Sequence, residues 1–215
     1  MKPTAERDVR VASGQAQLGG ILGLPEGARS VVLFAHGSGS GRMSPRNRFV
    51  AGVLQQAGLA TLLIDLLEEW EADDRGKVFD IELLAERLLS ATDWLVGNPD
   101  TKDLRIGYFG ASTGAAAALQ AAAERGEQIG AVVSRGGRPD LASHYLPRVT
   151  APTLLIVGGD DHPVIPLNEE AYALLRAPKD LVIVPRTGHL FEEPGALDEV
   201  ARLATDWFTR HLSAS

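Results

Sequence analysis

The stretch Leu104–Glu124, LRIGYFGASTGAAAALQAAAE, decides the fold. It begins with an apolar run typical of a buried strand and ends in an alanine-rich run typical of a helix. Between the two lies Gly110-Ala111-Ser112-Thr113-Gly114, a G-x-S-x-G pattern. On such a sharp strand-to-helix turn a serine is strained and exposed, with its hydroxyl at the end of the strand. The pattern predicts Ser112 as a nucleophile, while a serine that merely caps the helix is the plainer interpretation.

Outward from this turn, short apolar runs alternate with helical patterns. The predicted strands are Val31–Ala35, Ala60–Leu66, Leu104–Phe109, Ala131–Ser134, Thr153–Val157 and Leu181–Val184. The predicted helices are Arg46–Ala57, Ile81–Val96, Gly114–Arg125, Asn168–Arg176 and Ala196–Leu212. This alternation indicates βαβ units and a mostly parallel sheet with helices on both faces. Ahead of it, a glycine-interrupted apolar pattern over residues 9–21 predicts a β-hairpin.

Composition and charge are those of an ordinary globular protein, which we expect to form one domain over residues 1–215. The net charge of -7 at pH 7 disfavours a nucleic-acid partner, because phosphate backbones attract basic surfaces. The chain has no cysteine, which excludes disulfides, thiolate metal sites and a cysteine nucleophile. No apolar run approaches the roughly 18 residues of a membrane span, and no signal-peptide pattern is visible. We therefore expect a cytoplasmic protein with no membrane partner.

Two further strand ends carry the partners that a serine nucleophile needs. Asp160 and Asp161 follow the fifth predicted strand of the parallel set, and His189 follows the sixth. In α/β-hydrolases the order along the chain is serine, acid, histidine. We expect His189 to act as general base, Asp161 to orient it, and Asp160 to cap the turn. His144 and His162 are alternative bases that we expect to be exposed loop residues.

A glycine-rich loop, His36-Gly37-Ser38-Gly39-Ser40-Gly41, follows the first strand of the parallel set. It matches the loop that supplies one oxyanion donor in such hydrolases, the other coming from the residue after the nucleophile. We assign the two donors to the backbone N–H groups of Ser38 and Thr113. The loop lacks the spacing of nucleotide-binding loops, so nucleotide binding is the weaker interpretation. We expect His36 to be a structural, hydrogen-bonded residue.

The segments HGSGSGRMSPRN, GYFGASTGAA, LLIVGGDD and TGHLFEEPGAL together resemble those of α/β-hydrolases, most closely the dienelactone-hydrolase-like family. The resemblance covers most of the chain. It implies an eight-stranded, mostly parallel sheet with the second strand antiparallel, and ester or lactone hydrolysis through an acyl-enzyme. Dienelactone hydrolases use cysteine where this chain has Ser112, so a serine esterase is the function that we expect.

Two features bear on the substrate. About fifteen residues separate Ser134 from the next strand, too few for a helical cap domain, so we expect an open site for small or extended acyl groups. Arginines gather in the loops at the predicted active edge, namely Arg42, Arg46, Arg48, Arg135 and Arg138. Arg42, Arg135 and Arg138 are candidates for binding a substrate carboxylate. Ion pairs that stabilise the loops are the favoured alternative. The carboxylates between residues 68 and 74 indicate a metal site or, more often, a solvated loop.

The sequence as a whole predicts a serine carboxylic-ester hydrolase for a small-molecule ester, monomeric or homodimeric, needing neither cofactor nor metal. Thioester, amide or lactone hydrolysis and acyl transfer remain open, because the motifs do not separate them. A non-catalytic binding protein on the hydrolase fold is the alternative from a different class. Such a protein would usually have lost a member of the triad, whereas all three residues are present here.

Overall fold

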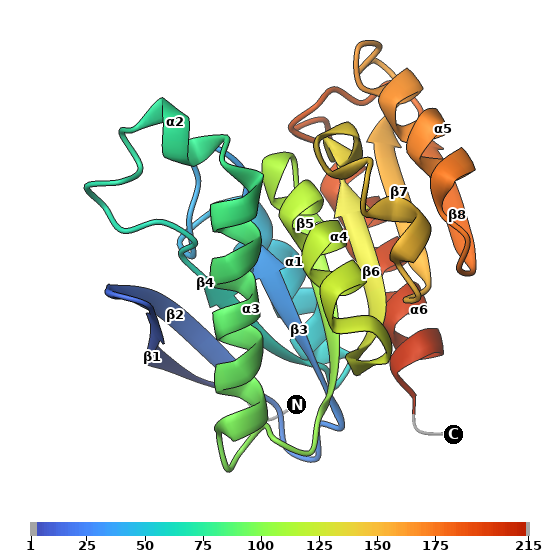
Figure 1. Cartoon of the computed structure of the whole chain (residues 1–215). Helices are drawn as coiled ribbons and strands as arrows, with labels where there is room; N and C mark the ends of the chain where they lie inside the picture. Colours follow the sequence, from blue (N-terminus) through green and yellow to red (C-terminus); the bar gives the residue numbers. More distant parts are fainter. Residues whose placement is uncertain (1–3, 214–215) are drawn as a thin grey trace.

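A computed structural model, which describes residues 4–213, contains an eight-stranded sheet between two layers of helices (Figure 1). The strands are β1 (Ala5–Ser13), β2 (Ala16–Leu24), β3 (Ser30–Ala35), β4 (Ala60–Ile64), β5 (Arg105–Ala111), β6 (Ile129–Arg135), β7 (Thr153–Gly158) and β8 (Lys179–Val184). The α-helices are α1 (Pro45–Gln56), α2 (Arg75–Val78), α3 (Ile81–Gly97), α4 (Thr113–Arg125), α5 (Ile165–Leu174) and α6 (Ala196–Leu212). The mostly parallel α/β sheet that the sequence predicts is confirmed.

The strand order is β1-β2-β4-β3-β5-β6-β7-β8. β1 and β2 form the predicted hairpin around Gly14, whose φ of +57° suits a residue without a side chain. β2 pairs antiparallel with β4, and the strands from β4 to β8 run parallel. This is the arrangement, with an antiparallel second strand, that the resemblance to α/β-hydrolases implies.

Two apolar cores lie on the two faces of the sheet. One contains side chains of α3, α4 and α5, and the other contains side chains of α1 and α6. Every residue of β3, β4 and β7 is buried, as expected for strands covered on both faces. Figure 1 shows α3 and α4 in front of the sheet and α1 and α6 behind it. The parallel strands therefore end at one common edge, where their following loops meet.

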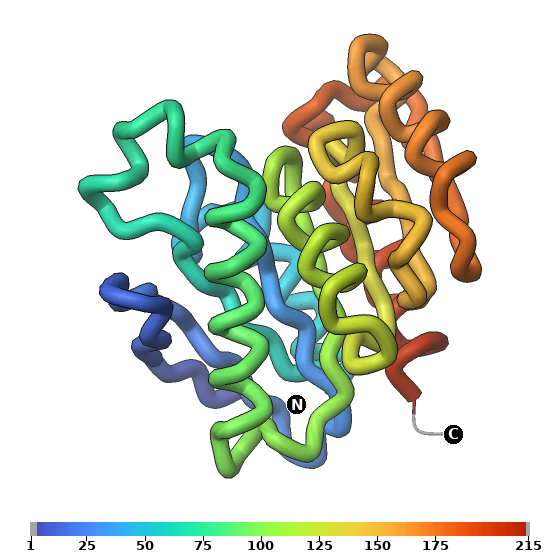
Figure 2. The backbone as a smooth tube through the Cα atoms, viewed as in Figure 1, coloured from blue at the N-terminus to red at the C-terminus, as the bar shows by residue number. Residues whose placement is uncertain are grey.

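These loops lie together along the upper edge of the backbone tube in Figure 2. The connection from β6 to β7 holds two short 3-10 helices, Pro139–Ala142 and Leu146–Arg148, and no cap domain, as predicted. The sequence did not predict α2, a single turn whose first N–H groups are capped by Asp74. No helix within residues 4–213 has the length and apolar character needed to cross a membrane.

Candidate active site

Ser112 occupies the turn between β5 and α4 in a conformation that residues with side chains rarely adopt, with φ 51° and ψ -120°. Glycines make this turn possible. A Cβ at Gly110 would lie 2.4 Å from the Cα of Ala115, and one at Gly114 would lie 2.2 Å from the carbonyl oxygen of Ala35. Ser112 occupies the N-cap position of α4, as the plainer interpretation expects, but in the described chain its side chain makes no capping hydrogen bond to the helix.

His189 and Asp161 meet although they come from different loops. The Nδ1 of His189 lies 2.7 Å from Oδ2 of Asp161, and the carboxylate side chain is only 8% exposed. A ring that donates its Nδ1 proton to a carboxylate keeps Nε2 free to accept one. The two loops can approach because Gly158 has no side chain, since a Cβ there would lie 2.3 Å from the carbonyl oxygen of Thr187.

The loop after β6 brings this pair and Ser112 to the same place. The N–H of Ser112 donates to the carbonyl of Arg135 across 3.3 Å. The next residue, Gly136, faces the histidine, because a Cβ at that position would lie 3.6 Å from Cε1 of His189. Ser112 therefore contacts residue 135 and His189 lies beside residue 136, so both lie near the end of β6.

The two predicted oxyanion donors line one small cavity. Ser38 is exposed and Thr113 is buried, and Thr113 is the first residue of α4, where N–H groups lack an intrahelical acceptor. The cavity measures about 30 Å³, and its apolar wall is formed by Leu67, Ala72, Val78 and Leu84. The hydroxyl of Thr113 is buried there without a hydrogen-bond partner in the described chain. The two residues predicted to supply the backbone donors thus border one confined space.

The remaining histidines and Asp160 do not take part in this arrangement. His36 is buried, its Nε2 accepts from the N–H of Leu66 at 2.9 Å, and its Nδ1 lies 2.9 Å from the Gly37 carbonyl. Burial lowers the pKa of His36, which fits the predicted structural role. His144 and His162 are exposed, as expected. The capping role expected of Asp160 is wrong, because within residues 4–213 its exposed carboxylate makes no hydrogen bond.

Four of the five loop arginines are held by carboxylates, as the favoured alternative predicted. The pairs are Arg42–Asp65, Arg46–Glu192, Arg48–Glu6 and Arg138–Asp140. Arg135 is different, since its side chain is 8% exposed and pairs with no carboxylate in residues 4–213. Burial, together with the neighbouring charge of Arg46, lowers the pKa of Arg135 to about 10.

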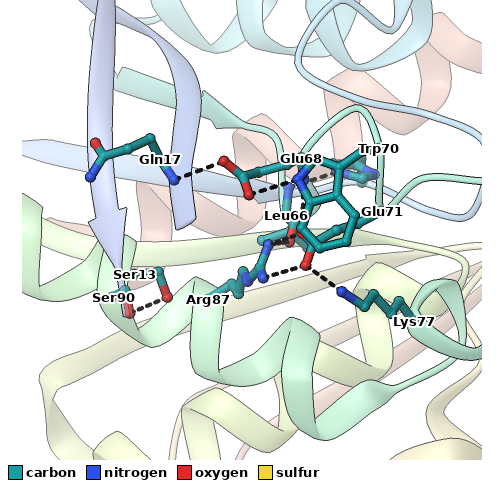
Figure 3. Close-up of polar contacts among 10 residues, drawn as sticks. Ser13, Gln17, Leu66, Glu68, Trp70, Glu71, Lys77, Arg87 and Ser90 are labelled. Carbon is teal, nitrogen blue, oxygen red and sulfur yellow. Dashed lines mark hydrogen bonds and ion pairs between the residues drawn. The ribbon is translucent and has the colours of Figure 1, made fainter. Parts of the chain in front are cut away.

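The acidic loop after β4 holds one buried carboxylate, whereas Glu69, Asp73 and Asp74 are exposed, as in the solvated loop that the sequence favoured. Glu71 is 3% exposed and accepts hydrogen bonds from both Nη atoms of Arg87, at 2.5 and 2.9 Å, and from Lys77 at 2.8 Å (Figure 3). These bonds lower the pKa of Glu71 to about 2. No group of three or more His, Cys, Asp or Glu side chains within residues 4–213 is arranged to hold a metal ion.

Comparisons with known proteins place this geometry in context. The model of the dienelactone hydrolase family matches residues 69–213. The chain is 63% identical to a solved dienelactone hydrolase from Anabaena variabilis, with a TM-score of 0.95 over 98% of this chain and 99% of that one. Est1E from Butyrivibrio proteoclasticus, 14% identical with a TM-score of 0.80 over 96% and 99% of the two chains, shares the fold.

Among curated proteins, the chain is 56% identical over 210 residues to a putative phosphoribosyl transferase of Mycobacterium tuberculosis. That match covers 98% of this chain and 47% of the relative. The chain thus spans about half the length of the curated relatives that it matches first. Their name describes a protein about twice as long as this chain.

Proposed function

The chain belongs to the dienelactone hydrolase family, and we propose that it is a hydrolase that cleaves carboxylic esters with Ser112 as nucleophile. The observation that carries this proposal is the 2.7 Å contact between Nδ1 of His189 and Asp161, made beside the strained turn that holds Ser112. A base oriented by a carboxylate near a partly exposed serine is the arrangement that activates a hydroxyl for acyl transfer.

In the proposed reaction, Ser112 Oγ attacks the acyl carbon while Nε2 of His189 takes the hydroxyl proton. Asp161 holds the Nδ1–H and stabilises the imidazolium. The N–H groups of Ser38 and Thr113 donate to the oxyanion of the tetrahedral intermediate. The intermediate collapses to an acyl-enzyme as His189 protonates the departing alcohol. Water, deprotonated by His189, then attacks the acyl-enzyme and releases the acid and the free serine.

The cavity beside the donors supports a short acyl group. Its volume of about 30 Å³ admits only a small group, and its far wall is apolar. An acetyl group fits such a space better than a long chain does. Activity on aryl esters should therefore fall from acetate to butyrate to octanoate, and Val78→Ala, which enlarges the cavity, should flatten that decline.

An active-serine probe tests the nucleophile without assuming a substrate. The protein is incubated with a fluorophosphonate, its intact mass is recorded and the modified peptide is mapped. We expect one adduct on Ser112, absent in Ser112→Ala and formed more slowly in His189→Ala, while the control Ser143→Ala labels normally. A folded protein that forms no adduct, or forms it on another serine, contradicts the proposal and favours a binding protein.

Asp161 and Asp160 offer a matched pair of substitutions for the acid. Asp161→Asn should lower kcat on an acetate ester by about 10²- to 10⁴-fold, because the ring loses its orienting acceptor. Asp160→Asn, which removes the same charge from the adjacent exposed position, should leave kcat within about twofold of the wild type. Equal effects of the two substitutions would contradict the assignment. A parallel panel of thioesters, amides and lactones decides between the chemistries that the motifs leave open.

A further inference from the structure

The Arg135 guanidinium is a buried charge for which the described chain provides no countercharge. Its Nε and Nη1 are sealed from solvent without an acceptor, and within residues 4–213 the side chain makes neither a hydrogen bond nor an ion pair. The guanidinium carbon lies 5.8 Å from the centre of the Phe191 ring. An unpaired charge held in an apolar surrounding is strongly unfavourable. A group from outside the described chain would relieve it.

The surroundings of Arg135 add positive charge. Arg46 acts on Arg135 as a like charge, and its own Nε is buried without a partner. Glu192, which pairs with Arg46 through Nη1 at 3.0 Å, is 65% exposed. Arg46 also lies in the first turn of the twelve-residue α1, whose positive end carries no acidic residue. Arg46 therefore adds a second positive charge near the Arg135 guanidinium.

That place adjoins the proposed catalytic residues. Arg135 lies opposite Ala111 in the pairing of β6 with β5, one residue before Ser112, and neighbouring strands are about 4.8 Å apart. Phe191, the ring in contact with Arg135, follows His189 by two residues and has a φ of 55°, a strained value for a buried aromatic residue. The guanidinium thus lies between the strand of the serine and the loop of the histidine.

The two sides of Ser112 differ in character. Phe191 belongs to the core on the α1 and α6 face of the sheet. The apolar wall of the 30 Å³ cavity includes Leu67, Val78 and Leu84, which belong to the core on the α3 and α4 face. An ester bound at Ser112 would have one part in the small cavity and the other part directed to the arginines.

We propose that Arg135, assisted by Arg46, binds an anionic oxygen group, a carboxylate or a phosphate, on the alcohol portion of a short-acyl ester. The inference rests on the proposed ester hydrolysis and names its substrate class. A guanidinium matches both anions because its N–H donors form a fork that two oxygens can engage. The neutral acyl group occupies the cavity, the anion neutralises the buried charge, and Ser112 attacks the ester bond between them.

Binding is tested first without turnover, in Ser112→Ala. This variant is titrated calorimetrically with p-hydroxybenzoate, with phenyl phosphate and with phenol as the neutral control. We expect at least one of the two anions to bind about tenfold or more tightly than phenol, and the better anion identifies carboxylate or phosphate. Adding Arg135→Gln should abolish this preference, whereas adding Arg138→Gln, whose guanidinium is already held by Asp140, should preserve it. Equal binding of all three compounds overturns the proposal.

The second test of the proposed anion subsite measures turnover. The substrates are phenyl acetate, acetate esters of hydroxybenzoic acids and a phenyl acetate that carries a phosphate monoester. In the wild type we expect kcat/KM for an anionic ester to exceed that for phenyl acetate by about 10- to 100-fold. Arg135→Gln should bring the ratio close to one, and the half-buried Arg46→Gln should lower it less.

The fluorophosphonate reaction distinguishes a failure of the proposed anion subsite from a failure of the proposed esterase function. Normal labelling of Ser112 with a ratio that Arg135→Gln does not change overturns the anion subsite and leaves the esterase intact. Loss of labelling in the wild type overturns the proposed function itself. If Arg135→Gln does not fold, Arg46→Gln decides, since an unchanged ratio in that variant contradicts the proposal and a lowered ratio supports it.

Discussion

Two arginines of this protein are buried to nearly the same extent and differ in what holds them. Arg87 is 6% exposed and Arg135 is 8% exposed. Arg87 donates to both carboxylate oxygens of Glu71 and, at 3.2 Å, to the carbonyl of Leu66 (Figure 3). Arg135 has none of these partners in the described chain. The countercharge, more than the burial, separates a cation that supports the fold from one that is available to a ligand.

The Arg87 pair supports the site indirectly. Glu71 lies in the loop after β4, and Leu67 and Ala72 of the same loop line the small cavity beside Ser38 and Thr113. The pair therefore fixes the wall against which the proposed acyl group would rest. The α3 face of the sheet thus carries Arg87 paired with a carboxylate, and the α1 face carries Arg135, which has no carboxylate partner among the described residues.

The substitution with the largest expected effect removes one partner of the Arg87–Glu71 ion pair. Arg87→Gln leaves Glu71 buried without its main partner, so the free energy of unfolding should fall by about 3–5 kcal/mol. Urea unfolding followed by circular dichroism measures this change. Glu69→Gln is the matched control, because Glu69 is exposed and unpaired among residues 4–213, and it should change stability by less than about 0.5 kcal/mol. A loss in Arg87→Gln as small as that of the control would contradict a structural role for the pair.

The second effect depends on pH. The pKa of Glu71 is about 2 in the folded protein, against an ordinary value of 4.5. A carboxyl whose pKa is lowered on folding stabilises the protein fully above its unfolded pKa and loses that contribution as pH falls through the folded value. The stability difference between the wild type and Glu71→Gln should therefore be constant above about pH 5 and shrink between pH 4.5 and 2. A difference that stays constant down to pH 2, measured by urea unfolding, would show that Glu71 does not titrate in this way.

The sequence predicted those features that depend on local pattern. The order of strands and helices follows from apolar periodicity, and the approach of residues 161 and 189, at the edge that also holds residue 112, follows because parallel strands end at one edge. It missed the pairing of Glu71 with Arg87, because sixteen residues and a change from loop to helix separate them. It missed α2 because a four-residue helix carries no periodicity.

Arg135 and Arg138 show most directly where prediction from sequence ends, since both lie in the segment SRGGRPD and have the same side chain. Arg138 pairs with Asp140, which is two residues later, and a pair so close in the chain can be predicted from the sequence. Arg135 is the last residue of β6, and its guanidinium lies against Phe191 on the α1 face. Which face a strand residue takes is fixed by register, and register depends on the whole sheet.

The last prediction repeats the arginine-to-glutamine substitution at the other buried arginine, where the expected change in stability is small. Arg135→Gln removes a buried charge that has no partner in the described chain, so no carboxylate is left uncompensated. The free energy of unfolding should stay within about 1 kcal/mol of the wild type or rise, in contrast to the large loss in Arg87→Gln. Urea unfolding without added anions measures both variants side by side. A loss of about 3 kcal/mol in Arg135→Gln would mean that the guanidinium has a structural partner, and the contrast between the two arginines would disappear. A neutral or stabilising result would mean that the wild-type protein tolerates an unfavourable charge in its free state, as a group kept for an anionic ligand would do.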